Sequence, residues 1–227
     1  LITGVAGFLG SNLYKFYKSK YEIYGGTYNK NFNLLDSRIL NLKLNSNKKI
    51  IHIIKKMNPE IIIHCAGWTD IEKCEKNKKK CKEANTELTK CLVEASTTIN
   101  SKFIYISSDH LFDGKKKMFK ENHKPTPLNY YAKTKVLSEN YLRKKLKNYI
   151  IIRTNFFGID KKFNKKNFLE MILRCLKQRI NIYLFNDVYY NPISIKVLAS
   201  TINKLLKIDY RGTINISGND RISKYMF

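Results

Sequence analysis

The first twenty residues constrain the fold more than any other stretch of the chain. Leu1 to Thr3 is predicted to end a strand, residues 11–20 have the apolar spacing of a helix, and between them stand Gly4, Gly7 and Gly10. Glycines let a chain turn tightly, and the amides at a helix N-terminus attract an anion such as a pyrophosphate. This order of strand, glycine turn and helix indicates a dinucleotide site, although the spacing differs from GxGxxG.

Predicted strands and helices continue to alternate after this turn. Apolar runs predict strands at residues 22–28, 60–65, 103–107 and 149–153, and helical spacing predicts helices at residues 48–57, 83–96 and 130–146. The strands at 60–65 and 103–107 contain unbroken apolar runs, Ile61 to Ile63 and Phe103 to Ile106, as in strands buried on both faces. Strands that alternate with helices predict an α/β fold with a doubly wound parallel sheet of the Rossmann type.

Beyond Arg153 the pattern is less regular. It predicts helices at residues 167–178 and 195–206, with an extended segment at 180–185 between them. We therefore predict a dinucleotide-binding domain over residues 1–153 and a small substrate-binding lobe over residues 154–227, with elements returning to the sheet. The chain begins without methionine, inside an apolar run, and ends at Phe227 with no stop signal. We therefore expect a fragment that lacks the start of the first strand and a C-terminal portion of the lobe.

Tyr131 and Lys135 form the pair that points most directly to catalysis. Their spacing places both side chains on one face of a predicted helix. A nearby ammonium favours the phenolate, so we expect Lys135 to lower the Tyr131 pKa from its reference value of about 10. Such a phenol suits proton donation to an alkoxide. Alone the pair is weak evidence for catalysis, because tyrosine and lysine are abundant in this chain and such pairs arise by chance.

Two other strand ends are predicted to lie near this pair. After the strand at 60–65 come the small residues Ala66 and Gly67, followed by Trp68, and small residues let the chain pass close to a bound nucleotide. After the strand at 103–107 comes Ser108, whose hydroxyl could bond the same carbonyl oxygen as the Tyr131 phenol. The alternative for Ser108 is a turn or a helix cap.

The end of the second strand bears on the choice between NAD and NADP. A carboxylate there would accept the ribose hydroxyls of NAD. Thr27 to Lys30 offers an ammonium and no carboxylate, so we expect NADPH, bound through Lys30, with NADH as the alternative. Asp36 would serve instead if the strand ended later, and Lys30 could also be one more solvated lysine.

The net charge of +25 suggests that the protein could bind nucleic acid, because lysine and arginine neutralise phosphates. Only seven of the 43 basic residues are arginine, the lysines are scattered in short runs, and lysine, asparagine and isoleucine together are what A/T-rich codons supply. We therefore attribute the charge to genome composition and expect no nucleic-acid partner.

The remaining composition indicates a cytoplasmic protein. The chain has no apolar run of the roughly 20 residues that cross a membrane, and it shows no secretion signal. The five cysteines form no CxxC pair, which favours reduced thiols. His64 and Cys65 are adjacent on a predicted strand and would point to opposite faces, so we expect no metal site.

Taken together in this order, these motifs resemble the extended short-chain dehydrogenase/reductase family. Within it the similarity is to the dTDP-4-dehydrorhamnose reductase subgroup. Residues 107–114, SSDHLFDG, are similar to that subgroup's STDYVFDG, and residues 127–135, PLNYYAKTK, resemble its P-x-N-x-Y-G-x-S-K. The stretch from His64 resembles its N-A-A-A-Y-T-x-V-D-x-x-E, and residues 211–215 and 221–225 also resemble its C-terminal half.

The resemblance implies reduction of the C4 ketone of a nucleotide-linked deoxysugar, in the synthesis of cell-surface polysaccharide precursors. It implies that Tyr131 donates the proton, that Lys135 holds the nicotinamide ribose, and that Ser108 bonds the ketone oxygen. The implied cofactor contacts also include Gly4, Gly7, Phe8, Leu9, Gly10, Ala66, Gly67, Trp68 and Asn85. The implied substrate contacts are Ser108, Asp109, His110, Asn155 and Phe156, and of these His110 and the Asn155-Phe156 segment depart from the subgroup's residues.

Three alternatives remain open at this point. One is an epimerase or dehydratase that regenerates its own cofactor, against which His110 counts because dehydratases usually have Glu after the Asp. Another is a binding-only subunit, since the regulatory subunit of methionine adenosyltransferase shares the fold. The last is the nucleic-acid binder that charge alone predicts. Whether the protein forms a homodimer is also left open.

Overall fold

The computed structural model describes residues 1–28, 38–41, 46–116, 118–159 and 167–227. Lys30 and Asp36, which were considered as cofactor contacts, lie outside these described residues.

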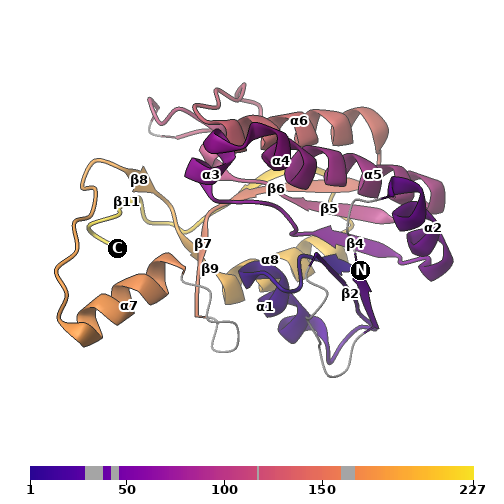
Figure 1. Cartoon of the computed structure of the whole chain (residues 1–227), viewed down its shortest axis with the longest axis horizontal. Helices are drawn as coiled ribbons and strands as arrows, with labels where there is room; N and C mark the ends of the chain where they lie inside the picture. The colour runs from indigo at the N-terminus through magenta and orange to yellow at the C-terminus, as the bar shows by residue number, and fades with distance from the viewer. Residues whose placement is uncertain (29–37, 42–45, 117, 160–166) are drawn as a thin grey trace.

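The centre of the described structure is one parallel sheet (Figure 1). Its strand order is β10 (Gly212–Ile216), β6 (Tyr149–Thr154), β5 (Lys102–Ile106), β4 (Ile61–His64), β1 (Ile2–Thr3), β2 (Tyr24–Thr27) and β3 (Arg38–Asn41). The chain runs outward from β1 to β3 and then returns to β4 on the other side of β1. The predicted doubly wound sheet is confirmed, and its strand order reverses between β1 and β4, where such sheets bind ligands.

Helices cover both faces of this sheet (Figure 1). On one face lie α1 (Phe8–Tyr17) and α8 (Ile195–Lys207), joined by a hydrogen bond from the Tyr17 hydroxyl to the Ala199 carbonyl at 2.9 Å. On the other lie α2 (Asn47–Met57), α5 (Leu88–Ile99) and α6 (Tyr130–Lys145). The buried isoleucines of β4, β5 and β6 fill the two cores between sheet and helices. Burial on both faces, predicted for residues 60–65 and 103–107, is present at residues 62–64 and 103–107, whereas Glu60 is exposed.

Local sequence signals set where these helices begin. The side chains of Ser46, Asn129 and Ser194 each accept a hydrogen bond from the amide three residues on, which caps α2, α6 and α8. In α2 the buried Ile50 and Ile54 lie one turn apart among exposed lysines, so the helix packs by a narrow apolar stripe.

The segment between β4 and α5 is more irregular than the sequence indicated. It forms the short helices α3 (Ile71–Lys76) and α4 (Lys78–Lys82), followed by the π-helical turn η1 (Glu83–Glu87). The helix predicted over 83–96 therefore begins with a π turn, a feature that is frequent at functional sites. Cys74 and Cys81 pack in this region against Tyr131 of α6.

The C-terminal residues form a small lobe beside the carboxyl ends of the strands and also return to the sheet (Figure 1). In the lobe β7 (Phe156–Phe157) pairs with β9 (Ile193–Ser194), and β8 (Tyr189–Tyr190) pairs with β11 (Ile222–Ser223), beside helix α7 (Phe168–Gln178). Residues 180–185, which we expected to be extended, form no strand. Helix α8 and strand β10 return to the main sheet, where β10 pairs with β6.

No helix in the described part of the chain is both long enough and apolar enough to cross a membrane.

Candidate functional site

The glycine turn lies directly on the ends of β1, β2 and β4. Gly4 has a φ of +73°, and its amide donates to the Gly26 carbonyl at 2.7 Å. A Cβ on Gly4 would lie 2.8 Å from the Ala66 amide nitrogen, and one on Gly10 would lie 2.3 Å from the Gly4 carbonyl oxygen. The turn therefore needs glycine at both positions, and it brings the first, unpaired amides of α1 to the edge of the sheet.

We expect Gly10→Ala to be destabilising because its new methyl group would push α1 away from Gly4. The free energy of unfolding should fall by about 1–3 kcal/mol in urea denaturation. Gly158→Ala is the matched control, since its Cβ would meet no atom closer than 3.5 Å, and it should change stability by less than about 1 kcal/mol. Equal stability of the two variants would contradict the close contact.

A cavity of about 940 Å³ opens above this turn. It is lined by the carboxyl ends of β1, β2 and β4 together with α4, and the lining includes Gly4, Gly7, Thr27, Tyr28, Ala66, Gly67, Trp68, Lys79 and Lys80. Not every predicted contact faces it: the Leu9 side chain is buried in the core, and the Phe8 ring packs 6.0 Å from the Phe156 ring. Leu9 could therefore reach a ligand in this cavity only through its backbone.

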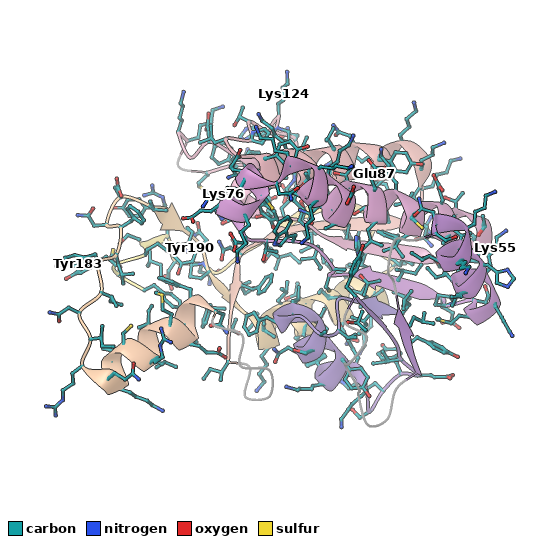
Figure 2. All side chains as sticks on the ribbon, viewed as in Figure 1. Lys55, Lys76, Glu87, Lys124, Tyr183 and Tyr190 are labelled. Carbon is teal, nitrogen blue, oxygen red and sulfur yellow. The ribbon has the colours of Figure 1, made fainter. Side chains whose placement is uncertain are left out.

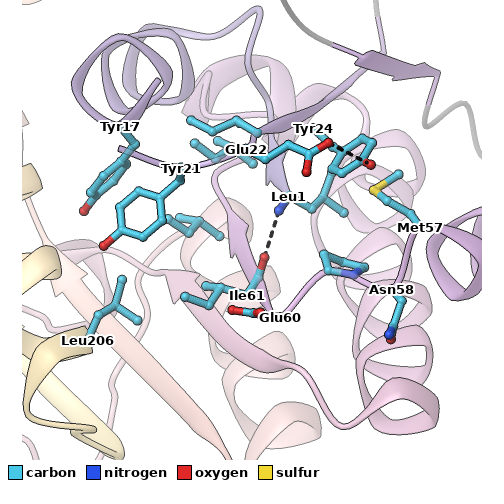
Figure 3. A pocket seen from close by; sticks show the side chains of 14 residues that line it. Leu1, Tyr17, Tyr21, Glu22, Tyr24, Met57, Asn58, Glu60, Ile61 and Leu206 are labelled. Carbon is cyan, nitrogen blue, oxygen red and sulfur yellow. Dashed lines mark hydrogen bonds between the residues drawn. The ribbon is translucent and has the colours of Figure 1, made fainter. Parts of the chain in front are cut away.

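A smaller cavity of about 320 Å³ lies at the opposite, amino ends of the strands (Figure 3). Its lining includes Leu1, Tyr17 and Met57, and the amino group of Leu1 donates to the Ile61 carbonyl at 2.8 Å. None of the predicted site residues lines this cavity.

Asn85 supports the strand end that carries Trp68. Its Oδ1 accepts from the Trp68 amide at 2.6 Å, while Nδ2 donates to the Trp68 carbonyl at 3.0 Å and to the Thr134 hydroxyl at 3.0 Å. The side chain is buried, so its contacts join the end of β4 to α6. Asn85 thus orders the wall of the larger cavity. Its side chain, which was expected to contact the cofactor, is engaged by Trp68 and Thr134.

Tyr131 and Lys135 lie one turn apart on α6, and both side chains are buried. The Lys135 ammonium donates to the Ile106 carbonyl at 2.8 Å and lies 4.7 Å from the centre of the Tyr105 ring. It also lies close to Gly67, where a Cβ would be 3.9 Å from Nζ. Burial lowers the pKa of Lys135 to about 8, because a buried ammonium loses its hydration.

The expectation that Lys135 would lower the Tyr131 pKa is wrong for this structure. Burial raises the pKa of Tyr131 well above its usual range, and a hydrogen-bonding interaction with Ser108 offsets only part of this. The Lys135 ammonium donates instead to the Ile106 carbonyl and lies 5.9 Å from the centre of the Tyr131 ring. The Tyr131 phenol is consequently protonated at neutral pH, as a proton donor must be.

Ser108 caps the short 3₁₀ helix η2 (Asp109–Leu111), so the alternative role weighed for it is present in the structure. Its Oγ accepts from the His110 amide at 3.2 Å and donates to the Asp109 carboxylate at 3.3 Å. The other Asp109 oxygen accepts from the Asn155 side chain at 2.9 Å, and the His110 ring lies 6.4 Å from the Tyr131 ring. The structure therefore brings Ser108, Asp109, His110 and Asn155 together beside Tyr131.

A buried carboxylate that the sequence analysis did not single out holds this loop in place. Glu139 is fully buried on α6 and accepts from the Ser107 hydroxyl at 2.6 Å, from Arg153 at 2.8 and 3.1 Å and from Arg143 at 2.6 Å. Burial opposes its charge, but the hydrogen bonds and the two guanidinium groups keep the pKa of Glu139 below its usual value. Its spacing in the sequence could have revealed it, because Glu139 is four residues after Lys135 and therefore lies on the same face of the helix.

His64 and the cysteines show no arrangement for a metal. The His64 nitrogens lie 2.7 Å from the Thr3 hydroxyl and 2.9 Å from the Thr89 hydroxyl, and burial lowers the His64 pKa to about 3, so the ring is neutral. All five cysteines are free thiols, and no group of three or more His, Cys, Asp or Glu residues in the described part of the chain could hold a metal ion.

The comparison that decides the family is with a model of the RmlD substrate binding domain, which matches residues 1–227. The chain belongs to this family. It is similar to a hypothetical dTDP-4-dehydrorhamnose reductase from Sulfolobus tokodaii, with 32% identity and a TM-score of 0.87 over 99% of this chain and 78% of the other. The resemblance to these reductases inferred from the motifs is confirmed.

Two further relatives of the family differ in what they do. A dTDP-4-dehydrorhamnose reductase from Bacillus anthracis, solved in complex with NADP, has 28% identity and a TM-score of 0.86 over 99% of this chain and 76% of that one. The methionine adenosyltransferase 2 subunit beta of Rattus norvegicus is 27% identical over 99% of this chain and 68% of its own length. Membership of the family therefore fits both a reductase and a subunit of another enzyme.

Proposed function

We propose that the protein is an NADPH-dependent reductase of the C4 ketone of a nucleotide-linked deoxysugar, of the dTDP-4-dehydrorhamnose reductase type. The observation that carries this proposal is the grouping of Tyr131 and Lys135 on α6 with Ser108 after β5. This group adjoins the large cavity through Gly67, a lining residue that lies close to the Lys135 ammonium. Residues 1–153 would bind the cofactor, and the lobe within residues 154–227 would contribute to the substrate site.

The glycine turn and the charged residues that line the cavity suit a nicotinamide dinucleotide. Gly4 and Gly10 leave no room for a side chain, so the backbone of the turn can approach a pyrophosphate directly. Three lysines and one glutamate are among the lining residues, which favours an anionic ligand (Lys73, Lys79, Lys80 and Glu83). When bound, the nicotinamide would supply the hydride that reduces the ketone.

The protein's own part of the chemistry is to hold the ketone and deliver a proton. Tyr131, whose pKa burial raises above its usual value, would donate its hydrogen to the oxygen as negative charge develops there. The Ser108 hydroxyl would bond the same oxygen, and the Lys135 ammonium would add positive charge from within a largely dry site. Asn85 and Glu139 would act through these residues, because one orders the end of β4 and the other orders the loop after β5.

The preference for NADPH over NADH is the finer part of the proposal. It is supported by the lysines of the cavity and by the NADP bound to the Bacillus anthracis relative. Fluorescence titration with each cofactor would test it, and a lower Kd for NADPH is expected. A lower Kd for NADH would overturn the preference while leaving the reductase proposal standing.

Cofactor binding should weaken as the pH rises through about 8, where the Lys135 pKa lies in the free protein. The protonated ammonium attracts the anionic cofactor, so its Kd should rise about tenfold between pH 7 and pH 9. Lys135→Met should bind weakly at both pH values and lose this dependence. Lys133→Met, which changes an exposed lysine of the same helix, should keep it. A Kd that is unchanged by pH in the parent protein would contradict this role.

A second function is favoured by the similarity to the methionine adenosyltransferase subunit. In that case the protein would bind a dinucleotide and a partner enzyme without turning over a keto sugar. An epimerase or dehydratase would instead turn over its sugar without net consumption of NADPH. Net oxidation of NADPH that depends on an added keto sugar would therefore distinguish the reductase from each of these.

A further inference from the structure

The lobe presents a half-buried cation that the chemistry above does not use. Pairing of β8 with β11 brings Lys224 next to Tyr190, and the Lys224 ammonium lies 3.5 Å from the centre of the Tyr190 ring and 4.9 Å from that of Phe168. Burial lowers the Lys224 pKa, and Asp109 partly offsets this by favouring the charge. Lys224 forms no ion pair with any residue that the structure describes.

The Tyr190 hydroxyl beside it is buried and unpaired. Its side chain is only 9% exposed, and the oxygen has no hydrogen-bond partner among the described residues. Buried hydroxyls are nearly always hydrogen-bonded, because losing water without a replacement partner costs free energy. Among the described residues the phenol has no hydrogen-bond partner, and the neighbouring ammonium has ring contacts but no ion pair. Such a pair of groups indicates a place where a ligand supplies the missing partners.

Tyr190 lies three residues before Ile193, whose amide donates to the Asn155 carbonyl at 3.0 Å, and the Asn155 side chain donates to Asp109 at 2.9 Å. The charge of Asp109 acts on Tyr190 as well as on Lys224, and Asp109 directly follows Ser108. Figure 2 shows Tyr190 between the lobe and the sheet, whereas Tyr183, which is 99% exposed, lies at the outer edge of the lobe. A ligand held by Tyr190 and Lys224 would therefore adjoin the site where a ketone would be reduced.

The mixture of charges selects the kind of ligand group. A phosphate or carboxylate near Lys224 would also face the negative charge of Asp109, and like charges at close range repel. A hydroxyl both donates and accepts, so one hydroxyl can donate to Asp109 while its neighbour accepts from Lys224 and pairs with Tyr190.

We propose that Tyr190, Lys224 and Asp109 bind neighbouring hydroxyl groups of the substrate's sugar ring, which rests on the proposed function and names the part of the substrate that the lobe recognises. This sugar subsite would distinguish a sugar with adjacent free hydroxyls from one that lacks them. It would contribute nothing to the binding of the nucleotide alone.

The test compares two ligands that differ only by the sugar. Isothermal titration calorimetry on the full-length protein with NADP⁺ would give the Kd of dTDP-rhamnose and of dTDP, and the ratio of the two measures what the sugar adds. In Lys224→Met and in Tyr190→Phe this ratio should fall about tenfold, with the Kd of dTDP unchanged. Lys177→Met and Tyr183→Phe, which change exposed residues of the lobe, are the matched controls and should keep the parent ratio.

A structural role would give a different result. Because the Tyr190 hydroxyl has no described partner, Tyr190→Phe should not lower the thermal midpoint of the ligand-free protein. A lowered midpoint with an unchanged ratio would show that the hydroxyl serves packing and would overturn the inference. Weakening of dTDP and dTDP-rhamnose to the same extent would also overturn it, since Lys224 would then hold the diphosphate.

Failure of this inference can be separated from failure of the proposed function. If the parent protein binds NADPH and dTDP-rhamnose but the variants keep the parent ratio, only the sugar subsite is wrong. If the parent binds NADPH but neither dTDP ligand, the subsite and the substrate class are both wrong. If the parent does not bind NADPH, the reductase proposal itself is wrong.

Discussion

Replacing Tyr131 by phenylalanine is expected to lower kcat for the keto sugar by about 10²–10⁴-fold, the range that general acid catalysis usually contributes. The change removes one oxygen from a buried side chain and leaves its ring packed against Cys74 and Cys81. NADPH binding and protein stability should therefore stay close to those of the parent. Steady-state rates at saturating cofactor and sugar would measure the effect.

Tyr130→Phe is the matched control for this variant. Tyr130 is the preceding residue of α6, and its ring lies 5.7 Å from the Lys78 ammonium near the surface. Phenylalanine keeps this ring and its cation–π contact and removes only the hydroxyl, so kcat should stay within about threefold of the parent value. Equal rates for the parent and Tyr131→Phe would remove Tyr131 from the proposed chemistry.

Replacing Glu139 by alanine is expected to lower the free energy of unfolding by about 3–5 kcal/mol, because it leaves Arg153 buried without its partner carboxylate. Urea denaturation at pH 7 would measure this. Glu94→Ala, which removes an exposed carboxylate bonded to Tyr141, should cost no more than about 1 kcal/mol. Similar losses from the two variants would contradict a structural role of the buried carboxylate.

The contribution of Glu139 should also depend on pH. Its pKa is lowered in the folded protein, so the stabilisation is present above the unfolded pKa and is lost as the pH falls through the folded pKa. The difference in stability between parent and Glu139→Ala should accordingly shrink in acid. Glu139 accepts a hydrogen bond from Ser107, the residue before Ser108, and so helps to hold Ser108 in position. The catalytic rate of Glu139→Gln would therefore measure how much the reaction depends on that position.

The sheet could be predicted largely because its central strands contain unbroken apolar runs, Ile61 to Ile63 and Phe103 to Ile106. Most of these residues are buried on both faces of the sheet, and such runs differ from the spaced apolar residues of an amphipathic helix. The edge strands β3 and β10 were not predicted. The residues of β10 are mostly half-buried, and the sequence of each strand mixes polar and apolar residues. The strands of two residues in the lobe are too short for any periodic pattern to reveal.

The grouping of the candidate site residues followed from chain order, whereas their electrostatics did not. Parallel strands end at one edge of a sheet, which is why the loops after β4 and β5 meet α6. The direction of the Tyr131 pKa shift depends on burial and on where the Lys135 ammonium points, and spacing specifies neither. Tyr190 and Lys224 are joined by a pairing of distant strands, so nothing local in the sequence marks them as neighbours.

The central claim is that this protein itself reduces a sugar ketone with hydride from NADPH. The most direct measurement incubates the full-length protein with dTDP-4-dehydrorhamnose and NADPH carrying deuterium at the transferable position of the nicotinamide, followed by mass spectrometry and NMR of the sugar. The account predicts one deuterium at carbon 4 of the product, formed in step with NADPH oxidation and lost in Tyr131→Phe. Recovery of unlabelled sugar and unoxidised NADPH, with NADPH still bound by the protein, would contradict it and favour a binding subunit.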